Sequence, residues 1–227
     1  MTSRARAAAP TLVLASGSPR RRELLARLGL DLEVAPADLD ETPLPDESPP
    51  LHALRVAREK AAATAALRPG SPVLAADTIV VVGGEILGKP RDRSDARAML
   101  RRLSGRAHLV ITAVAVRFGA REATVVEQAR VVFRPVPEPL LEWYLDTGEA
   151  GDKAGAYALQ GRGALLVERV EGNVQAVVGL PLAPLPELFE RVGLELRPRA
   201  GRLVLSRRGG SARRAPTGES SKRCGGR

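Results

Sequence analysis

Arg20, Arg21 and Arg22 form a run of three cations at the start of a predicted helix. Ser18 and Pro19 place that start, because serine is a preferred N-cap residue and proline suits the first helical position. A helix N-terminus carries partial positive charge, so three cations there are unfavourable unless an anion binds. Free backbone N–H groups and arginines both suit phosphate oxygens, and the stretch therefore predicts a phosphate site. The alternative is that the arginines are solvated surface charges.

Asp77 interrupts an apolar stretch, residues 72–82, that is typical of a buried strand. Because an unpaired buried charge is very costly, Asp77 requires a cation, hydrogen-bond donors or a raised pKa. We expect Glu41, from the acidic loop before the second predicted helix, to be its companion. Two carboxylates beside a phosphate site suit Mg²⁺, with Mn²⁺ as the alternative, because such ions take few protein ligands. The other interpretation is that Asp77 ends the strand and caps a neighbouring loop.

Lysine is rare, since 31 arginines accompany only four lysines. Lys60 lies at the margin of the apolar face of a predicted helix, Lys89 in a turn, and Lys153 at the start of the stretch DKAGAY. A compact ammonium on a flexible stem suits phosphate oxygens, and these three are candidates to bind them. Each could instead be an ordinary surface lysine. Lys222 belongs to the C-terminal tail and receives no role.

Strands and helices alternate along the chain. We expect a first strand and helix over 11–29, strands over 72–82, 108–118 and 123–136, and helices over 49–67, 94–104 and 137–148, with Ser94 as the cap of the third helix. A final strand and helix follow over 177–194. Gly83 and Gly84 predict a two-residue hairpin. Residues 31–48 and 152–172 read as loops. This order predicts an α/β fold with a mixed, twisted sheet, flanked by helices, in two lobes with a cleft between them.

The net charge of +9 is confined to the C-terminal part. Residues 197–227 hold ten of the 35 basic and one of the 26 acidic residues, so the rest of the chain is neutral. We expect a frayed N-terminus over 1–10, one domain over 11–197 and a disordered basic tail over 198–227. A signal peptide is the alternative for the first residues. The single cysteine and the lack of an apolar run of about 20 residues favour a cytoplasmic protein without a membrane span.

Several stretches together resemble the Maf-like nucleoside triphosphate pyrophosphatases, a family with the Maf/ITPase-like fold. They occur in the family's order and are LASGSPRRRELLARLGL (14–30), AREKA (57–61), AADTIVVVGGEILGKPRD (75–92), LSGRAH (103–108), DKAGAYALQGRGA (152–164) and VVGLPL (177–182). The resemblance implies hydrolysis between the α- and β-phosphates of a nucleoside triphosphate, with a divalent metal. It implies that Asp77 is the general base. It also implies that Arg20, Thr78 and Gln160 are the set typical of enzymes acting on dTTP and UTP rather than 7-methyl-GTP. Val174 departs from the pattern, since relatives commonly have an aromatic residue there.

Residue types and resemblance together give one predicted site. The candidates for substrate binding are Ser16, Ser18, Arg20, Arg21, Lys60, Thr78, Lys89, Lys153 and Gln160. Asp77 and Glu41 are the candidates for the metal, and Asp77 is the catalytic base, a metal ligand or both.

Other functions stay open from sequence. The chain could be a house-cleaning pyrophosphatase for modified nucleotides, or a nucleotide-binding regulator of cell division. Nucleic acid is expected as a partner only through the basic tail, and a homodimer would suit the fold.

Overall fold

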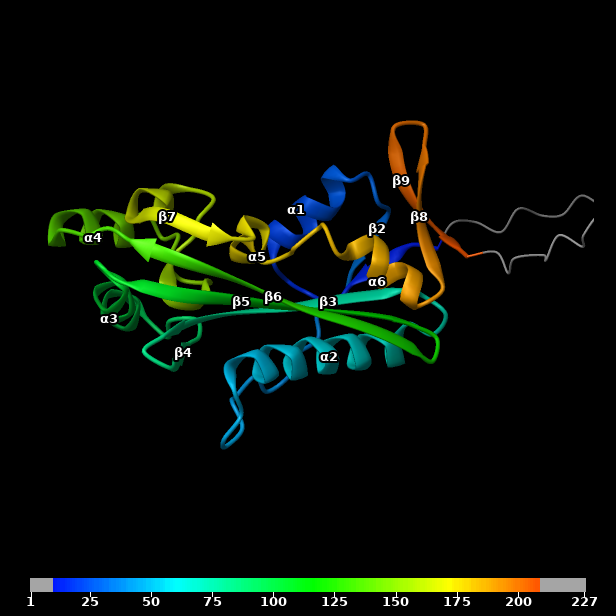
Figure 1. Cartoon of the computed structure of the whole chain (residues 1–227), viewed down its shortest axis with the longest axis horizontal. Helices are drawn as coiled ribbons and strands as arrows, with labels where there is room; N and C mark the ends of the chain where they lie inside the picture. Colours follow the sequence, from blue (N-terminus) through cyan, green and yellow to red (C-terminus); the bar gives the residue numbers. More distant parts are fainter. Residues whose placement is uncertain (1–9, 209–227) are drawn as a thin grey trace, which may run out of the picture.

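The fold is built on one mixed sheet of seven strands, in the order β2-β1-β3-β5-β6-β7 with β4 paired to β3 (Figure 1). The computed structural model describes residues 10–208. The strands are β1 (Leu12–Leu14), β2 (Leu32–Val34), β3 (Val73–Val82), β4 (Glu85–Leu87), β5 (Ala107–Phe118), β6 (Arg121–Phe133) and β7 (Val167–Gly172). β1 runs parallel to β2 and β3, and the other pairs are antiparallel. The predicted mixed α/β class is confirmed.

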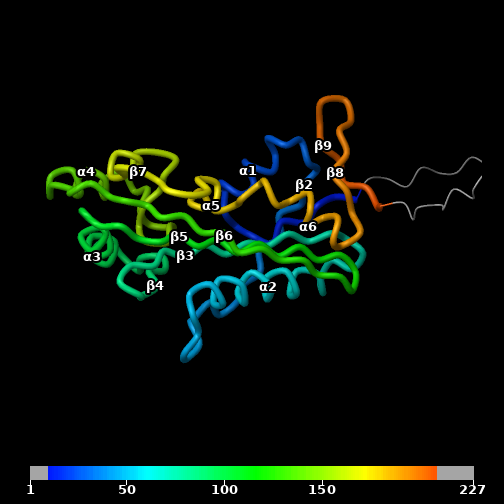
Figure 2. Tube along the Cα trace, viewed as in Figure 1, coloured from blue at the N-terminus to red at the C-terminus, as the bar shows by residue number. Residues whose placement is uncertain are grey.

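Helices cover both faces of this sheet. They are α1 (Pro19–Arg27), α2 (Pro49–Leu67), α3 (Arg93–Leu103), α4 (Glu138–Asp146), α5 (Val174–Val178) and α6 (Leu185–Arg191), with 3-10 turns η1 (Ala154–Ala156) and η2 (Arg162–Leu166). In Figures 1 and 2, α2 lies along one face of the long strands, while α1, α5 and α6 lie on the other. Buried Ala53, Ala57 and Ala61 bring the axis of α2 close to the sheet, because alanine adds little bulk.

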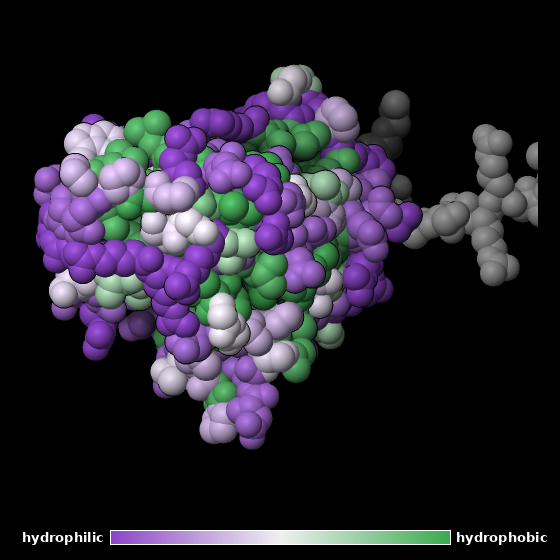
Figure 3. Space-filling model, turned by 60° about the vertical axis from the view of Figure 1, so that its left-hand side comes forward, coloured by the Kyte–Doolittle hydropathy of each residue, from purple (hydrophilic) through white to green (hydrophobic). Residues whose placement is uncertain are grey.

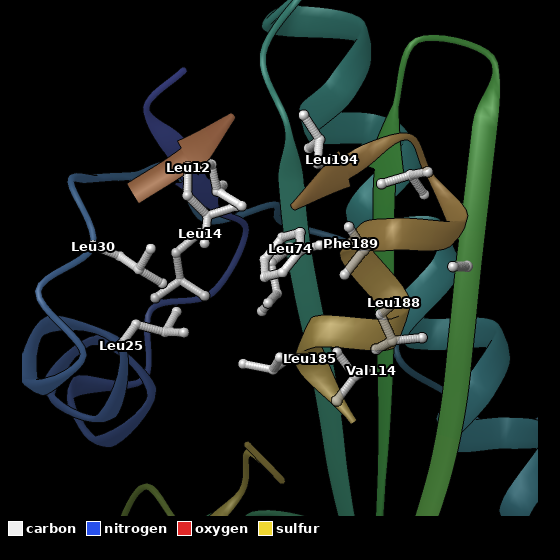
Figure 4. Close-up of a cluster of buried hydrophobic side chains, with 14 of the residues drawn as sticks. Leu12, Leu14, Leu25, Leu30, Leu74, Val114, Leu185, Leu188, Phe189 and Leu194 are labelled. Atoms are coloured by element: carbon white, nitrogen blue, oxygen red, sulfur yellow. The ribbon is translucent and has the colours of Figure 1, made fainter. Parts of the chain in front are cut away.

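Two further hydrophobic clusters divide the molecule along its length. One joins β1, α1 and α6 and contains Leu14, Leu25 and Phe189 (Figure 4). The other lies under α3 and α4 and contains Phe133 and Tyr144. β3 contributes Leu74 to the first and Val80 to the second. Asp77 therefore lies between the two clusters, on the strand that connects them.

Local signals placed most helix starts correctly, with two corrections. Ser18 is the N-cap residue of α1, but its side chain makes no capping hydrogen bond. The expected cap of α3, Ser94, lies inside the helix, because the side chain of Asp92 accepts from the backbone N–H of Asp95 and caps it instead. Aspartate and serine are both preferred N-cap residues, so the sequence alone did not distinguish Asp92 from Ser94 as the cap.

The C-terminal part differs from the expectation of disorder beyond residue 197. β8 (Leu194–Arg199) and β9 (Arg202–Arg207) pair as an antiparallel hairpin. Its Leu205 is buried in the first cluster, and the N–H of Leu203 donates to the carbonyl oxygen of Leu28 at 3.0 Å. The tail prediction is therefore wrong for residues 198–207, because a few apolar side chains attach the hairpin to the body. The remaining tail, and residues 1–9, lie outside the described residues.

Three other elements were missed or misassigned. The predicted strand at 177 is instead the end of α5 (Val174–Val178), which Gly179 caps with φ 111°. β2 and β7 form within segments that were expected to be loops. Both have only three to six residues, and their hydrogen bonds come from strands distant in sequence. Strands this short contain too few residues for the alternation of apolar and polar side chains to identify them in the sequence.

The surface is mainly polar on the side where α3 and α4 lie. Figure 3 shows hydrophilic residues over most of that face, with hydrophobic residues in patches between them. Over residues 10–208, no helix has the length and apolar character required to cross a membrane.

Candidate active site

A cavity of about 700 Å³ opens where β1 leads into α1, beside the middle of β3. Ten of the eleven residues predicted for the site line it: Ser16, Ser18, Arg20, Arg21, Glu41, Lys60, Asp77, Thr78, Lys89 and Lys153. They come from segments spread over more than 130 residues of sequence. Gln160 does not line the cavity, and its side chain is exposed. The arginine-bearing helix start and Asp77 thus face the same space.

An ammonium joins the two predicted acids. Lys60 Nζ lies 2.8 Å from Glu41 Oε1 and 2.9 Å from Asp77 Oδ1. Lys60 and Asp77 are buried, whereas the side chain of Glu41 is 42% exposed. Asp77 therefore has the cation that its burial requires, and α2 supplies it. Glu41 contacts the same ammonium as Asp77, and its role as a companion metal ligand stays a prediction.

The donor set at this point fits a hard divalent cation. Two carboxylates converge on one position of positive charge, and carboxylate oxygens are ligands that Mg²⁺ and Mn²⁺ prefer. Within residues 10–208, no cluster of three or more acidic, histidine or cysteine side chains could hold a metal. A cation held here would thus depend on substrate and water for its other ligands.

Arg21 donates three hydrogen bonds to other residues of the protein. Its Nε donates to the carbonyl oxygen of Gly179 at 2.8 Å, and its two terminal nitrogens donate to Ser16 Oγ at 2.8 Å and Thr78 Oγ1 at 2.9 Å. Burial lowers the pKa of Arg21, and the nearby Asp77 opposes that shift. Since a guanidinium has five N–H groups, two remain for a ligand. Arg21 therefore joins α1, β3 and the end of α5 while it lines the cavity.

Thr78 connects this hydrogen-bond network from β3 to the neighbouring strand β5. Its hydroxyl lies 2.8 Å from that of Thr112, which also lies 2.7 Å from the carbonyl oxygen of Ala176. Thr112 must donate to that carbonyl, so Thr78 donates to Thr112 and accepts from Arg21. Thr112 was missed from sequence because it reads as an ordinary strand residue of β5. The proton of the Thr78 hydroxyl is thus not free for a substrate.

Arg20 is half-buried and lines the cavity, one residue before Arg21. Its Nε is buried without a hydrogen-bond partner in the part of the chain that the structure describes. Burial lowers the pKa of Arg20, while the charges of Asp152 and Glu149 raise it. Arg20 therefore lines the cavity and has one donor, Nε, that no described residue satisfies.

Lys89 and Lys153 reach the cavity from two loops that are tied together. The N–H of Gly155 donates to the carbonyl oxygen of Gly88 at 3.0 Å. Gly155 has φ 68°, and a Cβ there would lie 2.9 Å from a methyl group of Val80. Only glycine suits this position. Lys153 also pairs with the neighbouring Asp152.

A buried aromatic group supports the cavity wall. His108 Nε2 and the hydroxyl of Tyr157, which lines the cavity, are 2.9 Å apart. The rings of His108, Phe133 and Tyr157 pack edge to face, with centroids 4.8 to 5.4 Å apart. Burial lowers the pKa of His108 from 6.5 to about 4. His108 is therefore neutral at pH 7.

We expect this buried histidine to make folding sensitive to acid. Below pH 6.5 the unfolded chain takes up a proton at His108 before the folded chain does, so stability falls as the pH drops from 6.5 to about 4. The loss is roughly 3 kcal/mol, since one pKa unit corresponds to about 1.4 kcal/mol. Urea unfolding at pH 7 and pH 4 should show this loss in the wild type and a smaller one in His108→Gln. Equal losses in the two proteins would contradict the assignment.

Comparison with known proteins finds relatives that belong to one family. The sequence profile of a family described as "Maf-like protein" matches residues 11–192. A "dTTP/UTP pyrophosphatase" of Anaeromyxobacter dehalogenans (strain 2CP-1) is 57% identical over 192 residues, which cover 83% of this chain and 97% of that protein. A protein of the same description from Myxococcus xanthus (strain DK1622) is 54% identical over 189 residues, covering 83% and 96%. Among solved structures, a HAM1 protein from Coxiella burnetii covers 57% of this chain and 75% of its own, with 19% identity and a TM-score of 0.39. That likeness is too low to bear on the fold.

Proposed function

From the premise that this chain belongs to the Maf-like protein family, we propose that it is a nucleoside triphosphate pyrophosphatase acting on dTTP and UTP. The products are the nucleoside monophosphate and pyrophosphate. Relatives at 54–57% identity, described as dTTP/UTP pyrophosphatases, support this reaction.

The observation that carries the proposal is the set of charges in one cavity. Five cationic side chains line it, and one buried carboxylate, Asp77, lies among them. The cations are Arg20, Arg21, Lys60, Lys89 and Lys153. A triphosphate carries several negative charges, so this many cations are needed to bind it and to stabilise departing pyrophosphate. A site for a neutral ligand would have no such requirement.

In this reaction Asp77 takes the proton of the attacking water. Its carboxylate is held in place by Lys60, and it borders the same space as the arginines. A carboxylate fixed in this way beside the substrate can act as a general base for a water molecule. The oxygen of the water attacks phosphorus as the bond to the leaving pyrophosphate breaks, and the lysines neutralise the leaving group.

A divalent cation, Mg²⁺ or Mn²⁺, would be held by Asp77 and Glu41 and would polarise the phosphate oxygens when bound. The convergence of these two carboxylates supports the proposal. Because Lys60 now contacts both acids, its ammonium must give up at least part of this contact when the cation binds.

Selectivity for dTTP and UTP is assigned to Arg20, Thr78 and Gln160, as the resemblance to the family implies. Arg20 supports this because its side chain lines the cavity and its Nε has no hydrogen-bond partner among the described residues. Gln160 lies outside the cavity wall, so it would contact a nucleotide that extends beyond the cavity. The cytoplasmic location, the homodimer and nucleic-acid binding by the tail stay predictions.

Product analysis tests the function. The full chain with Mg²⁺ should release pyrophosphate and the monophosphate from dTTP and UTP, at least about tenfold more efficiently than from dCTP or dGTP. Chelation by EDTA should stop the reaction, and added Mg²⁺ should restore it. Release of inorganic phosphate alone would refute the proposal. Faster cleavage of 5-methyl-UTP would favour a house-cleaning role, and nucleotide binding without turnover a regulatory one.

A further inference from the structure

Glu149 follows α4 and holds a turn of the chain that lies thirteen residues further on. Both of its carboxylate oxygens accept from the backbone N–H of Arg162, at 3.0 and 3.1 Å, and Oε2 also accepts from that of Gly163 at 3.3 Å. These are charge-assisted hydrogen bonds, which are stronger than those between neutral groups. The mechanism proposed above does not use Glu149.

The backbone of the turn is shaped around this carboxylate. Gly161 has φ 139°, and a Cβ there would lie 2.9 and 3.0 Å from the two oxygens of Glu149. A Cβ at Gly163 would lie 2.5 Å from the carbonyl oxygen of Ala158. Both positions therefore disfavour larger residues: Gly163 because the backbone is in the way, and Gly161 because of its positive φ, with the Glu149 carboxylate close by in addition.

A second hydrogen bond fixes the chain just before the turn, at Ala158. The backbone N–H of Ala158 donates to the hydroxyl of buried Tyr144 at 3.1 Å. Residues 159–161, which include Gln160, thus lie between two fixed points, one at Tyr144 and one at Glu149. Both points belong to α4 or to the chain just after it.

Glu149 also lies close to the cavity. Its charge, with that of Asp152, raises the pKa of Arg20 against the effect of burial. The chain between Glu149 and the turn supplies Asp152, Lys153 and Tyr157 to the cavity wall. Glu149 thus contacts the turn that carries Gln160 and lies near enough to Arg20 for the two charges to interact.

We propose that Glu149 is a positioning residue for nucleotide selectivity: its carboxylate holds the turn 160–163 against the Arg20 side of the cavity. This rests on the proposed function. It predicts that Glu149 affects binding of the nucleotide more than turnover, since it touches neither Asp77 nor Lys60.

The test compares Glu149→Gln, Gly161→Ala and the control Glu138→Gln with wild type. Glutamine keeps the shape but loses the charge and one acceptor, and Gly161→Ala obstructs the same contact from the turn. Glu138, the first residue of α4, pairs with Arg101 on the surface and does not line the cavity. Calorimetry measures the Kd of α,β-imido-dUTP, an analogue that resists cleavage, and kinetics give kcat and KM for dTTP, UTP and dCTP.

In both site variants we expect the Kd of the analogue and the KM for dTTP to rise about tenfold, the change that a lost charge-assisted hydrogen bond produces. Turnover should stay within about threefold, the preference for dTTP over dCTP should fall, and Glu138→Gln should match wild type. An unchanged Kd in Glu149→Gln would overturn the proposal, as would a loss of kcat with unchanged Kd and selectivity.

The same data separate this inference from the proposed function. If wild type binds the analogue but cleaves neither dTTP nor UTP, the proposed function fails, and the Kd values still decide the role of Glu149. If wild type cleaves both and Glu149→Gln binds and selects normally, only this inference fails. If wild type neither binds nor cleaves, both are wrong.

Discussion

Replacing Asp77 by asparagine is expected to lower kcat for dTTP and UTP by about 1,000-fold, within the range that general-base catalysis contributes. Asparagine has nearly the shape of aspartate but cannot accept the proton of the attacking water. The substitution also removes the ionic partner of Lys60, which lies 2.9 Å from the carboxylate. The expected effect is therefore on turnover, with a smaller effect on stability.

Pyrophosphate release under saturating nucleotide measures this effect, and thermal unfolding shows whether the variant is folded. Asp40→Asn is a suitable control, because Asp40 lies exposed in the same acidic loop as Glu41 and bonds only to Thr42 in the described part of the chain. Wild-type rates in Asp77→Asn would remove Asp77 from the mechanism. Equal losses in both variants would point to a general effect of charge.

Replacing Arg21 by lysine is expected to affect both folding and activity. The guanidinium makes three hydrogen bonds, to Ser16, Thr78 and Gly179, and a lysine ammonium cannot reach all three in that planar arrangement. Unsatisfied buried groups remain, so we expect the free energy of unfolding to fall by roughly 3 kcal/mol. We expect kcat/KM for dTTP to fall by about 100-fold, since the loop that would bind phosphate and the strand of Asp77 lose their common tie.

Denaturant unfolding and steady-state kinetics measure the two effects. Arg22→Lys is the matched control, because Arg22 is the next residue of the same helix but is exposed. We expect it to change stability by less than about 0.5 kcal/mol. A stable and active Arg21→Lys would show that the network around Arg21 contributes little to either property.

Much of the fold could be predicted because its signals are local. Proline at the starts of α1 and α2 marks helix starts, the two glycines after β3 mark the hairpin, and the long strands β3, β5 and β6 are mostly apolar. Each of these patterns acts within a few residues, and so sequence alone identifies it. The hairpin β8–β9 was not predicted, because it has few apolar residues and these are buried only when they pack in the cluster with α1 and α6.

The candidate site followed from unusual residue types. It is unfavourable to place three arginines at a helix start, or a carboxylate inside a buried strand, without a ligand or a partner. The few lysines stood out because the chain otherwise uses arginine. Their side chains line one cavity, except for Gln160. For these residues the chemistry of the side chain was sufficient to indicate the site.

Sequence by itself determined which groups must find partners, and the tertiary structure decided which partners they found. Lys60 contacts both Glu41 and Asp77, Arg21 is held by Gly179 from a distant segment, and Glu149 holds the turn at Arg162. The physical reason is that the need for compensation belongs to a single residue, because burial of a charge or polar group is costly wherever it occurs. The contact that meets this need joins residues up to 158 positions apart and forms only when the sheet and helices pack.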